Sequence, residues 1–309
     1  MSGLYLVADI GGTNARFALV ENGDPGPVWS IEVESASTFA EALDAFLAAN
    51  DGEPRITAAG IAVAGPVDGG AVKLTNAPWL IRSMDVSERL GGVRVSLFND
   101  LEAVALALPY LRPGDIASLG PPLDAVPRAR LLAVNVGTGF GAATAIPVGA
   151  DGWTACPSEA GHMGLATRTQ EERGILDRLG ASSIEDALSG ERFVALYRGV
   201  GGETREDDKP EAIMARIAGD RAASEAVRLF TVWLGRVCGD LVLATASWGG
   251  VFLSGGLVES WRAVADTALF RSSFADKGKM RDRMVGVPTA VILRPNVALF
   301  GLARVLAQA

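Results

Sequence analysis

The sequence predicts an α/β protein of two lobes, each a mixed sheet flanked by helices with a cleft between the lobes. Apolar runs alternate with amphipathic helical patterns along the chain, which is typical of this class. A strand, a glycine turn and a second strand occur in succession at Leu4–Val20 and again at Leu131–Ile146. The repeat indicates a duplicated architecture. Convergence of two similar hairpins stays open as an alternative, because identity between the halves is weak.

In the first lobe the apolar runs Leu4–Ile10, Ala15–Val20 and Val28–Val33 predict successive strands. A helix is expected over Thr38–Ala49, with Thr38 as N-cap and Glu41 as the third helical residue. The remaining expected elements of this lobe are strands at Thr57–Val63 and Val93–Phe98, a short helix at Val86–Leu90, and a helix at Leu101–Leu108 that stops at Pro109.

The second lobe is expected to open with the strand Leu131–Val136, the turn VGTGFG and the strand Ala142–Ile146. Most of the chain after Ile146 has a helical pattern, including Ser224–Ser247, whose charged residues make it a packed helix and not a membrane segment. The stretch VFLSGGLVES predicts a buried strand, a glycine pair and a helix. We expect residues 1–109 with a C-terminal helix at 297–309 to form the small lobe, and residues 110–296 the large lobe.

Composition excludes several classes of partner. The chain of 309 residues has 28 Lys and Arg against 36 Asp and Glu, a net charge of −8, which argues against a nucleic-acid or anionic-membrane surface. No basic region precedes a long apolar segment, and no run approaches the ~18 apolar residues of a membrane span, so a cytoplasmic location is expected. Cys156 and Cys238 are isolated, and we expect both to be buried thiols. The single histidine, His162, rules out a multi-histidine metal centre.

The first glycine turn has the composition of a phosphate-binding loop. Gly11 and Gly12 allow a tight bend whose backbone N–H groups stay accessible to a polyphosphate. The turn leads into a second strand, whereas a Rossmann or P-loop glycine segment leads into a helix. No GxxxxGK[ST] motif occurs in the chain. The sequence therefore predicts a hairpin phosphate site of another kind.

Six motifs occur in order and together carry a family resemblance. They are DIGGTN at Asp9–Asn14, FND at Phe98–Asp100, NVGTGFG at Asn135–Gly141, SEAGH at Ser158–His162, EDALSG at Glu185–Gly190 and LSGG at Leu253–Gly256. From Tyr5 to the C-terminal helix the chain resembles the bacterial glucokinases of the hexokinase/actin-like ATPase superfamily. The cysteine-rich zinc motif of the related repressor/kinase group is absent, so the chain resembles the zinc-free branch and no structural zinc is expected. The resemblance implies the two-lobed actin-like fold and ATP-dependent phosphorylation of the glucose C6 hydroxyl to glucose 6-phosphate, the first step of glycolysis.

Asp100 is the candidate catalytic base. It follows an apolar strand and precedes a helix, a position that places a carboxylate at the carboxyl end of a strand. Such a carboxylate can accept the proton of a sugar hydroxyl and orient its oxygen toward the γ-phosphate. A helix N-cap, for which Asp is a preferred residue, is the alternative interpretation. The resemblance favours the base.

Sugar recognition needs side chains that donate and accept hydrogen bonds in fixed directions. The resemblance implies that such ligands, together with Asp100, are Asn99, Glu159, His162 and Glu185. Asn76, in the segment TNAPW, is a further candidate on the sugar side, although a turn residue explains it equally well.

The nucleotide is expected at the glycine turns. The candidate phosphate and nucleotide contacts are Asp9, Ile10, Gly11, Gly12, Thr13 and Asn14 in one lobe, and Gly137, Thr138, Gly139, Gly255 and Gly256 in the other. A tight turn is the simpler explanation of the last glycine pair. Asp9 is expected to hold Mg²⁺, because Mg²⁺ is commonly shared between a carboxylate and substrate phosphates. Arg16 offers the alternative that Asp9 forms a structural ion pair.

Other functions stay open at this level. Changes between Glu159 and Glu185 could adapt the chain to another hexose or to an amino sugar. A sugar-responsive regulator and an actin-like filament subunit are the non-enzymatic alternatives; regulators of the related group usually carry an added helix-turn-helix, whereas the first strand here is expected by Leu4. ATP, ADP and polyphosphate could each use glycine turns, and the resemblance favours ATP. The expected partners are glucose and ATP, with no nucleic acid and no membrane, and the family implies a homodimer.

Overall fold

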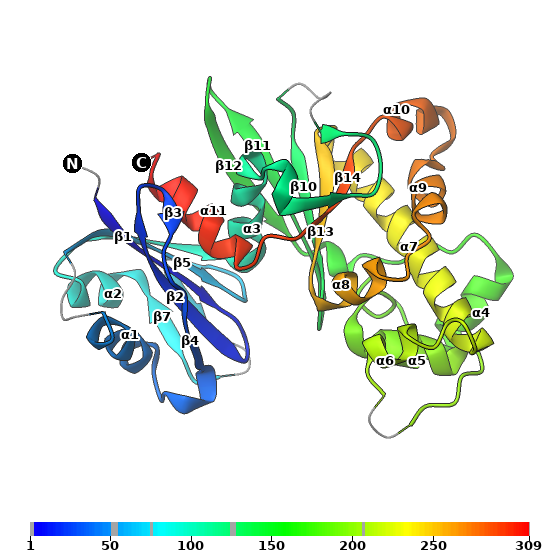
Figure 1. Cartoon of the computed structure of the whole chain (residues 1–309), viewed down its shortest axis with the longest axis horizontal. Coiled ribbons are helices and arrows are strands. Elements are labelled where there is room, and N and C mark those ends of the chain that lie inside the picture. Colours follow the sequence, from blue (N-terminus) through cyan, green and yellow to red (C-terminus); the bar gives the residue numbers. More distant parts are fainter. Residues whose placement is uncertain (1–2, 51–54, 75–76, 124–127, 206–207, 309) are drawn as a thin grey trace. The chain divides into compact units, whose positions relative to one another are not determined.

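The computed structural model describes residues 3–50, 55–74, 77–123, 128–205 and 208–308. The chain forms two compact units. The first comprises Met1–Tyr110, Val148–Ala155 and Pro295–Ala309, and the second comprises Leu111–Pro147 and Cys156–Arg294. A six-stranded mixed sheet with helices packed on it forms the centre of each unit (Figure 1). The α/β class predicted from the sequence is confirmed.

The first sheet has the strand order β3-β2-β1-β5-β8, and β4 also pairs with β2. Its strands are β1 (Leu4–Ile10), β2 (Asn14–Glu21), β3 (Asp24–Pro25), β4 (Trp29–Glu32), β5 (Ile56–Val63) and β8 (Arg94–Asn99). Strand β1 is antiparallel to β2 and parallel to β5, and β5 is parallel to β8. The carboxyl ends of β1, β5 and β8 therefore share one edge of the sheet.

Helices cover both faces of this sheet (Figure 1). They are α1 (Phe39–Ala48), α2 (Ser83–Arg89), α3 (Asp100–Ala107) and α11 (Val297–Leu306), and a two-stranded ribbon of β6 (Ala71–Lys73) and β7 (Leu80–Arg82) is added. On the α1 face the Phe17 ring stacks on Phe46 at 5.4 Å between centroids. On the other face α11 packs on α3, β1 and β5. Burial of this aromatic and aliphatic surface stabilises the sheet.

The N-terminus of α1 forms as predicted. The Glu41 N–H donates to Thr38 Oγ1 at 3.2 Å, and the Ser37 N–H donates to the Glu41 carboxylate at 2.8 Å. Helix α2 instead begins at Ser83, three residues before the predicted start at Val86. Its N-cap is Arg82, whose side chain makes no capping hydrogen bond, so the sequence carries no polar cap signal there.

The second sheet has the strand order β12-β11-β10-β13-β14-β9. Its strands are β9 (Ile116–Ser118), β10 (Leu131–Val136), β11 (Phe140–Val148), β12 (Gly152–Ser158), β13 (Gly250–Ser254) and β14 (Thr289–Ile292). Strands β12 and β14 were not predicted individually. Strand β12 is mostly exposed and has no clear apolar alternation, and β14 has only four residues, so neither gives a strong sequence signal.

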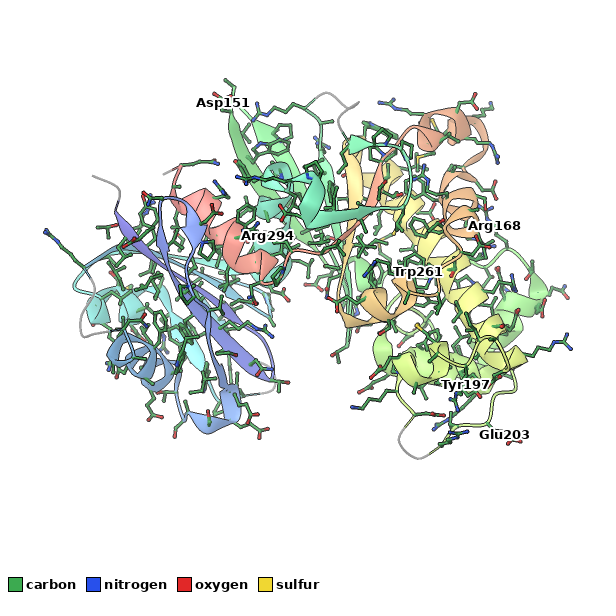
Figure 2. The ribbon with its side chains drawn as sticks, in the orientation of Figure 1. Asp151, Arg168, Tyr197, Glu203, Trp261 and Arg294 are labelled. Atoms are coloured by element: carbon green, nitrogen blue, oxygen red, sulfur yellow. The ribbon has the colours of Figure 1, made fainter. Side chains whose placement is uncertain are left out.

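The helices of the second unit pack around a central buried helix, α7. They are α4 (Gln170–Leu179), α5 (Gly190–Gly199), α6 (Pro210–Met214), α7 (Arg221–Thr245), α8 (Gly256–Arg262), α9 (Thr267–Ala275) and α10 (Arg281–Val285). Two glycines of α7 admit α9 closely, since a Cβ at Gly235 would lie 2.6 Å from the Phe270 carbonyl oxygen. Trp261, which is labelled in Figure 2, lies in α8, and its indole N–H donates to the buried Thr231 hydroxyl at 2.8 Å. Among the described helices, α7 included, none is apolar enough over sufficient length to cross a membrane.

The two cysteines differ in environment. Cys238 is buried in α7, and burial raises the pKa of its thiol to about 12, as expected for an apolar structural thiol. Cys156 is exposed on β12, so the prediction that both cysteines are buried is wrong for this residue. Because β12 was not predicted, its exposed face was not predicted either.

Candidate active site

The carboxyl edge of the first sheet collects the acidic candidates of the first unit. Asp9 is the penultimate residue of β1 and is the register partner of Ala62 in β5. Asn99 is the last residue of β8 and is the partner of Val63. Asp100 follows directly as the first residue of α3. Ligands of open α/β sheets bind at such carboxyl ends.

The first glycine turn closes the β1–β2 hairpin at the same edge. The Gly11 N–H donates to the Asn14 carbonyl at 2.9 Å, and Gly12 and Thr13 are exposed. The Ile10 side chain is fully buried, so any ligand contact of this residue must use its backbone. The exposed residues of the turn therefore lie between Asp9 and the start of β2.

Asp9 is a partly buried carboxylate, and its cationic neighbour among the described residues is Arg16. Burial raises its pKa to about 6, the Arg16 guanidinium opposes this rise, and the negative charge of Asp100 adds to it. Arg16 Nη1 lies 3.6 Å from Asp9 Oδ2, so the ion pair considered as the alternative role of Asp9 is present. Antiparallel register explains it, because Asp9 and Arg16 are direct cross-strand partners.

Asn99 is the N-cap of α3. Its Oδ1 accepts hydrogen bonds from the Leu101 N–H at 3.0 Å and the Glu102 N–H at 3.4 Å. The Glu102 carboxylate accepts from the Asn99 N–H at 3.2 Å and completes a capping box, and burial raises the Glu102 pKa. Asn99 Nδ2 donates to the Gly65 carbonyl at 3.2 Å. The sequence Asn99-x-x-Glu102 was the available signal for this cap.

Asp100 is thus inside the helix, and the alternative that it is the N-cap is wrong. Its Oδ1 accepts from the Leu101 N–H at 2.9 Å. The Asn99 cap directly before it fixes the backbone conformation at Asp100, the first residue of α3. The side chain is therefore held at the sheet edge near Asp9.

In the second unit the glycine turn Gly137–Gly139 lies beside the glycine pair Gly255–Gly256. The Gly137 N–H donates to the Gly139 carbonyl at 3.0 Å. A Cβ at Gly255 would lie 2.4 Å from the Val136 carbonyl oxygen, and Gly255 has φ +103°, so this position requires glycine. Thr138 and Gly256 are exposed. The predicted nucleotide glycines of this unit are thereby brought together at the carboxyl ends of β10 and β13.

Two residues beside these turns were not predicted as site residues. The Ser254 hydroxyl donates to Asn135 Oδ1 at 3.2 Å and links the ends of β13 and β10. The signal for Asn135 was its place as the single polar residue of an otherwise apolar strand.

The sugar candidates of the second unit gather around one short turn. Glu159 and His162 flank Ala160 and Gly161, with side chains 81% and 70% exposed and His162 Nε2 3.8 Å from Glu159 Oε2. The Glu185 N–H donates to the Gly161 carbonyl at 2.9 Å. The structure thus brings these three candidates into one neighbourhood. Asn76 lies outside the described residues.

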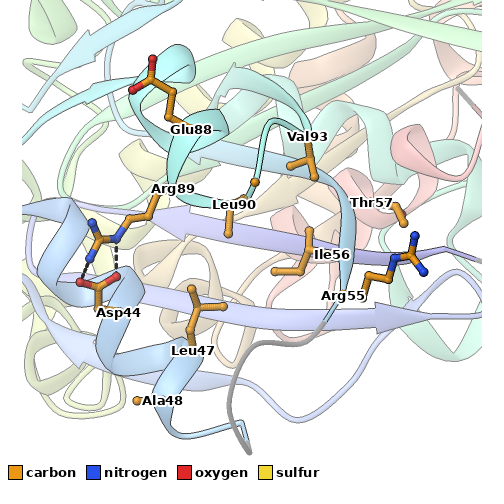
Figure 3. A pocket seen from close by; sticks show the side chains of 11 residues that line it. Asp44, Leu47, Ala48, Arg55, Ile56, Thr57, Glu88, Arg89, Leu90 and Val93 are labelled. Atoms are coloured by element: carbon orange, nitrogen blue, oxygen red, sulfur yellow. Dashed lines mark hydrogen bonds and ion pairs between the residues drawn. The ribbon is translucent and has the colours of Figure 1, made fainter.

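A pocket of about 1130 Å³ in the first unit lies away from this chemistry (Figure 3). It is lined at the amino ends of β5 and β8 by Ile56, Thr57 and Val93, and is bordered by an ion pair between Asp44 and Arg89. Asp9 and Asp100 occupy the opposite, carboxyl edge of the same sheet. None of the described residues that line the pocket is a predicted site residue.

The profile of the Glucokinase family matches residues 6–309. The chain belongs to the glucokinase family. A glucokinase from Nitrobacter hamburgensis is 34% identical over 314 residues, covering 98% of this chain and 97% of the relative. A glucokinase from Caulobacter sp. is 38% identical, covering 97% and 94%. The crystal structure of a glucokinase from an Antarctic psychrotroph superposes with a TM-score of 0.88 at 28% identity over the full length of both chains.

Membership of the glucokinase family confirms the resemblance drawn from the six motifs. It also confirms the expected fold class, since the psychrotroph glucokinase has the same architecture. The chain is accordingly an enzyme of the sugar-kinase class.

Proposed function

We propose that this protein transfers the γ-phosphoryl group of ATP to the C6 hydroxyl of glucose and forms glucose 6-phosphate. The observation that supports it most is the placement of Asp100 at the carboxyl edge of the first sheet, beside Asp9 and the glycine turn, in a member of the glucokinase family. This edge offers a carboxylate for an alcohol and backbone for phosphates in one place.

Asp100 acts as the general base. Its carboxylate accepts the proton of the sugar hydroxyl and orients the oxygen for in-line attack. Phosphoryl transfer depends on positioning and charge stabilisation more than on covalent participation. The Asn99 cap and the Asp100–Leu101 hydrogen bond supply that positioning.

The proposed glucose ligands are Asn99 in the first unit and, in the second, Glu159, His162 and Glu185. Within the described residues, Asn99 uses both acceptor positions of its carboxamide and one N–H, so one N–H remains for a sugar oxygen. Glu159 and His162 are exposed acceptor and donor groups, and Glu185 lies beside them. Asn76 stays a proposed contributor.

The residues proposed for ATP are 9–14 in the first unit and, in the second, Gly137–Gly139 and Gly255–Gly256. Asp9 suits Mg²⁺ because it is a hard oxygen donor in a partly buried site. Among the described residues no group of three or more His, Cys, Asp or Glu side chains is placed to hold a metal by itself. Mg²⁺ usually keeps waters and shares substrate phosphates, so one carboxylate fits this mode. When bound, Mg²⁺ neutralises charge on the phosphates.

The test is a kinase assay with a panel of sugars and donors. Purified protein, Mg²⁺ and ATP, ADP or polyphosphate are combined with glucose, other hexoses and amino sugars, and the product is assigned by phosphorus NMR. The proposal expects ATP and glucose to give the highest kcat/KM, with phosphate on the C6 oxygen. A higher kcat/KM for another sugar, or no turnover with any, would contradict it.

Three further expectations stay proposals. A homodimer is implied by the family, and light scattering of the purified protein tests it. Cell fractionation tests the cytoplasmic location. The lobe limits of 1–109 with 297–309, and 110–296, are tested by limited proteolysis.

A further inference from the structure

The segment Glu185–Gly190 is bonded to two candidate loops of the second unit. At its start the Glu185 N–H donates to the Gly161 carbonyl at 2.9 Å. Gly161 lies in the turn Glu159–His162, which is called the sugar loop below. The Glu185 carboxylate contacts a different loop. Its Oε2 accepts a hydrogen bond from the Phe140 N–H at 2.8 Å, and Phe140 directly follows the glycine turn Gly137–Gly139. At its end the Gly190 N–H donates to the Gly137 carbonyl at 2.8 Å. This short segment thus bonds to the sugar loop and to both sides of the glycine turn Gly137–Gly139, which is called the phosphate turn below.

The contacts leave little space for independent movement. A Cβ at Gly139 would lie 2.5 Å from Glu185 Oε2, and a Cβ at Gly161 would lie 2.3 Å from the Phe140 carbonyl oxygen. Because these glycines allow such close approach, a shift of the turn displaces the Glu185 carboxylate, and a shift of the carboxylate displaces the turn.

We propose that Glu185 is a positioning residue that couples sugar binding to the shape of the phosphate turn. The inference rests on the proposed function. Oε2 fixes the turn, while Oε1, which makes no hydrogen bond to the described protein, faces a sugar hydroxyl. A sugar that orders this carboxylate then orders the turn, and a nucleotide that orders the turn improves the sugar site by the same factor.

The first test places a methyl group on the phosphate turn and measures the affinity for glucose. Gly139→Ala needs no left-handed backbone, so its Cβ conflicts only with the movable Glu185 carboxylate. We expect the glucose Kd, measured by calorimetry without nucleotide, to rise about tenfold as a charged hydrogen bond is lost. Gly219→Ala, where a Cβ meets open space, is the matched control and should leave the Kd unchanged.

A double-mutant cycle separates coupling from general damage. In a Glu185→Ala background the methyl group of Gly139→Ala has no carboxylate to displace, so the second substitution should cause no further loss of glucose affinity. An unchanged Kd in Gly139→Ala alone, or an equal loss in both backgrounds, would overturn the inference. Wild-type protein that binds no glucose would instead overturn the proposed function, and this inference with it.

The reciprocal arm measures nucleotide affinity without sugar. Glu185→Gln keeps an oxygen that accepts from the Phe140 N–H, so the Kd of a non-hydrolysable ATP analogue should stay near the wild-type value. Glu185→Ala leaves that N–H unpaired, and the same Kd should rise about tenfold. Equal nucleotide affinity in both variants would contradict a role of Glu185 in the turn. This arm is informative even if Gly139→Ala does not fold.

Discussion

At the scale of single residues, the Asp9 carboxylate lowers stability at the position where we propose a Mg²⁺ ligand. Its carboxylate is only 18% exposed and lies near Asp100, so the charged form is disfavoured despite the Arg16 pair. The folded protein therefore binds a proton on Asp9 more tightly than the unfolded chain does. A cation near Asp9 would reverse this, which suits the proposed Mg²⁺ site. Functional sites often retain such unfavourable groups.

Asp9→Asn should stabilise the metal-free protein above neutral pH. The pKa is about 6 when folded against an ordinary 3.8, so ionisation of Asp9 lowers the unfolding free energy by about 3 kcal/mol at pH 8. Because the folded-state pKa is raised, this destabilisation is absent below pH 4, grows as the pH rises, and is complete above about pH 6. Urea unfolding in EDTA at pH 5, 6 and 8 measures the difference.

The advantage of Asp9→Asn should shrink as the pH falls from 8 toward 4. The exposed Asp85→Asn is the control, since its surface pair with Arg82 contributes less than about 1 kcal/mol. An Asp9→Asn variant that is less stable than wild type at pH 8 would show that the Arg16 pair outweighs the burial of Asp9.

At the scale of elements, α3 carries the candidate base and is held from two directions. The Asn99 cap and its bond to Gly65 tie the N-terminus of α3 to the end of β5. Along its length α3 packs on α11, where a Cβ at Gly301 would lie 1.9 Å from the Ala103 carbonyl oxygen. The position of Asp100 therefore depends on a helix close to the end of the chain.

Gly301→Ala should destabilise the protein by about 3 kcal/mol, because the added methyl group must push α11 away from α3. Chemical denaturation measures this loss. Gly174→Ala in α4 is the matched helical control, since its Cβ meets only the flexible end of Arg178 at 3.6 Å. Removal of that helical glycine should be neutral or stabilise by about 1 kcal/mol. Equal effects of the two substitutions would show that the α3–α11 contact is not tight.

At the scale of the whole molecule, the sequence predicted the elements whose signals are local. Strands β1 and β10 were predicted with their observed bounds, because each is an apolar run ended by glycine. Thr38 marked the start of α1 by its own side chain. Strand order was not predicted, because the pairing of β1 with β5 and of β10 with β13 joins segments far apart in the chain.

The candidate site divides in the same way. Motifs identified the turns and Asp100, and the hairpin made an Arg16–Asp9 pair foreseeable. The Asn99–Gly65 bond and the Glu185–Phe140 bond could not be predicted, because each depends on how distant loops pack. The exposed Cys156 was missed for a related reason, since its strand has no apolar face to reveal it.

Both sheets repeat one arrangement, an antiparallel hairpin followed by two parallel strands, as β2-β1-β5-β8 and β11-β10-β13-β14. This agrees with the duplicated architecture indicated by the sequence. Asp9 and Asn135 are the penultimate residues of the equivalent strands β1 and β10. One is an acid with a raised pKa and the other is a neutral amide bonded to Ser254, so equivalent positions carry different chemistry.

Turnover of Asp100→Asn with glucose, ATP and Mg²⁺ tests the central claim most directly. The amide oxygen can still accept from the Leu101 N–H, so the fold and the glucose Kd should change little, whereas proton acceptance is lost. We expect kcat to fall by about 10²- to 10⁴-fold, with glucose binding largely retained in calorimetry. A kcat within a few-fold of wild type would contradict the assignment of Asp100 as the base.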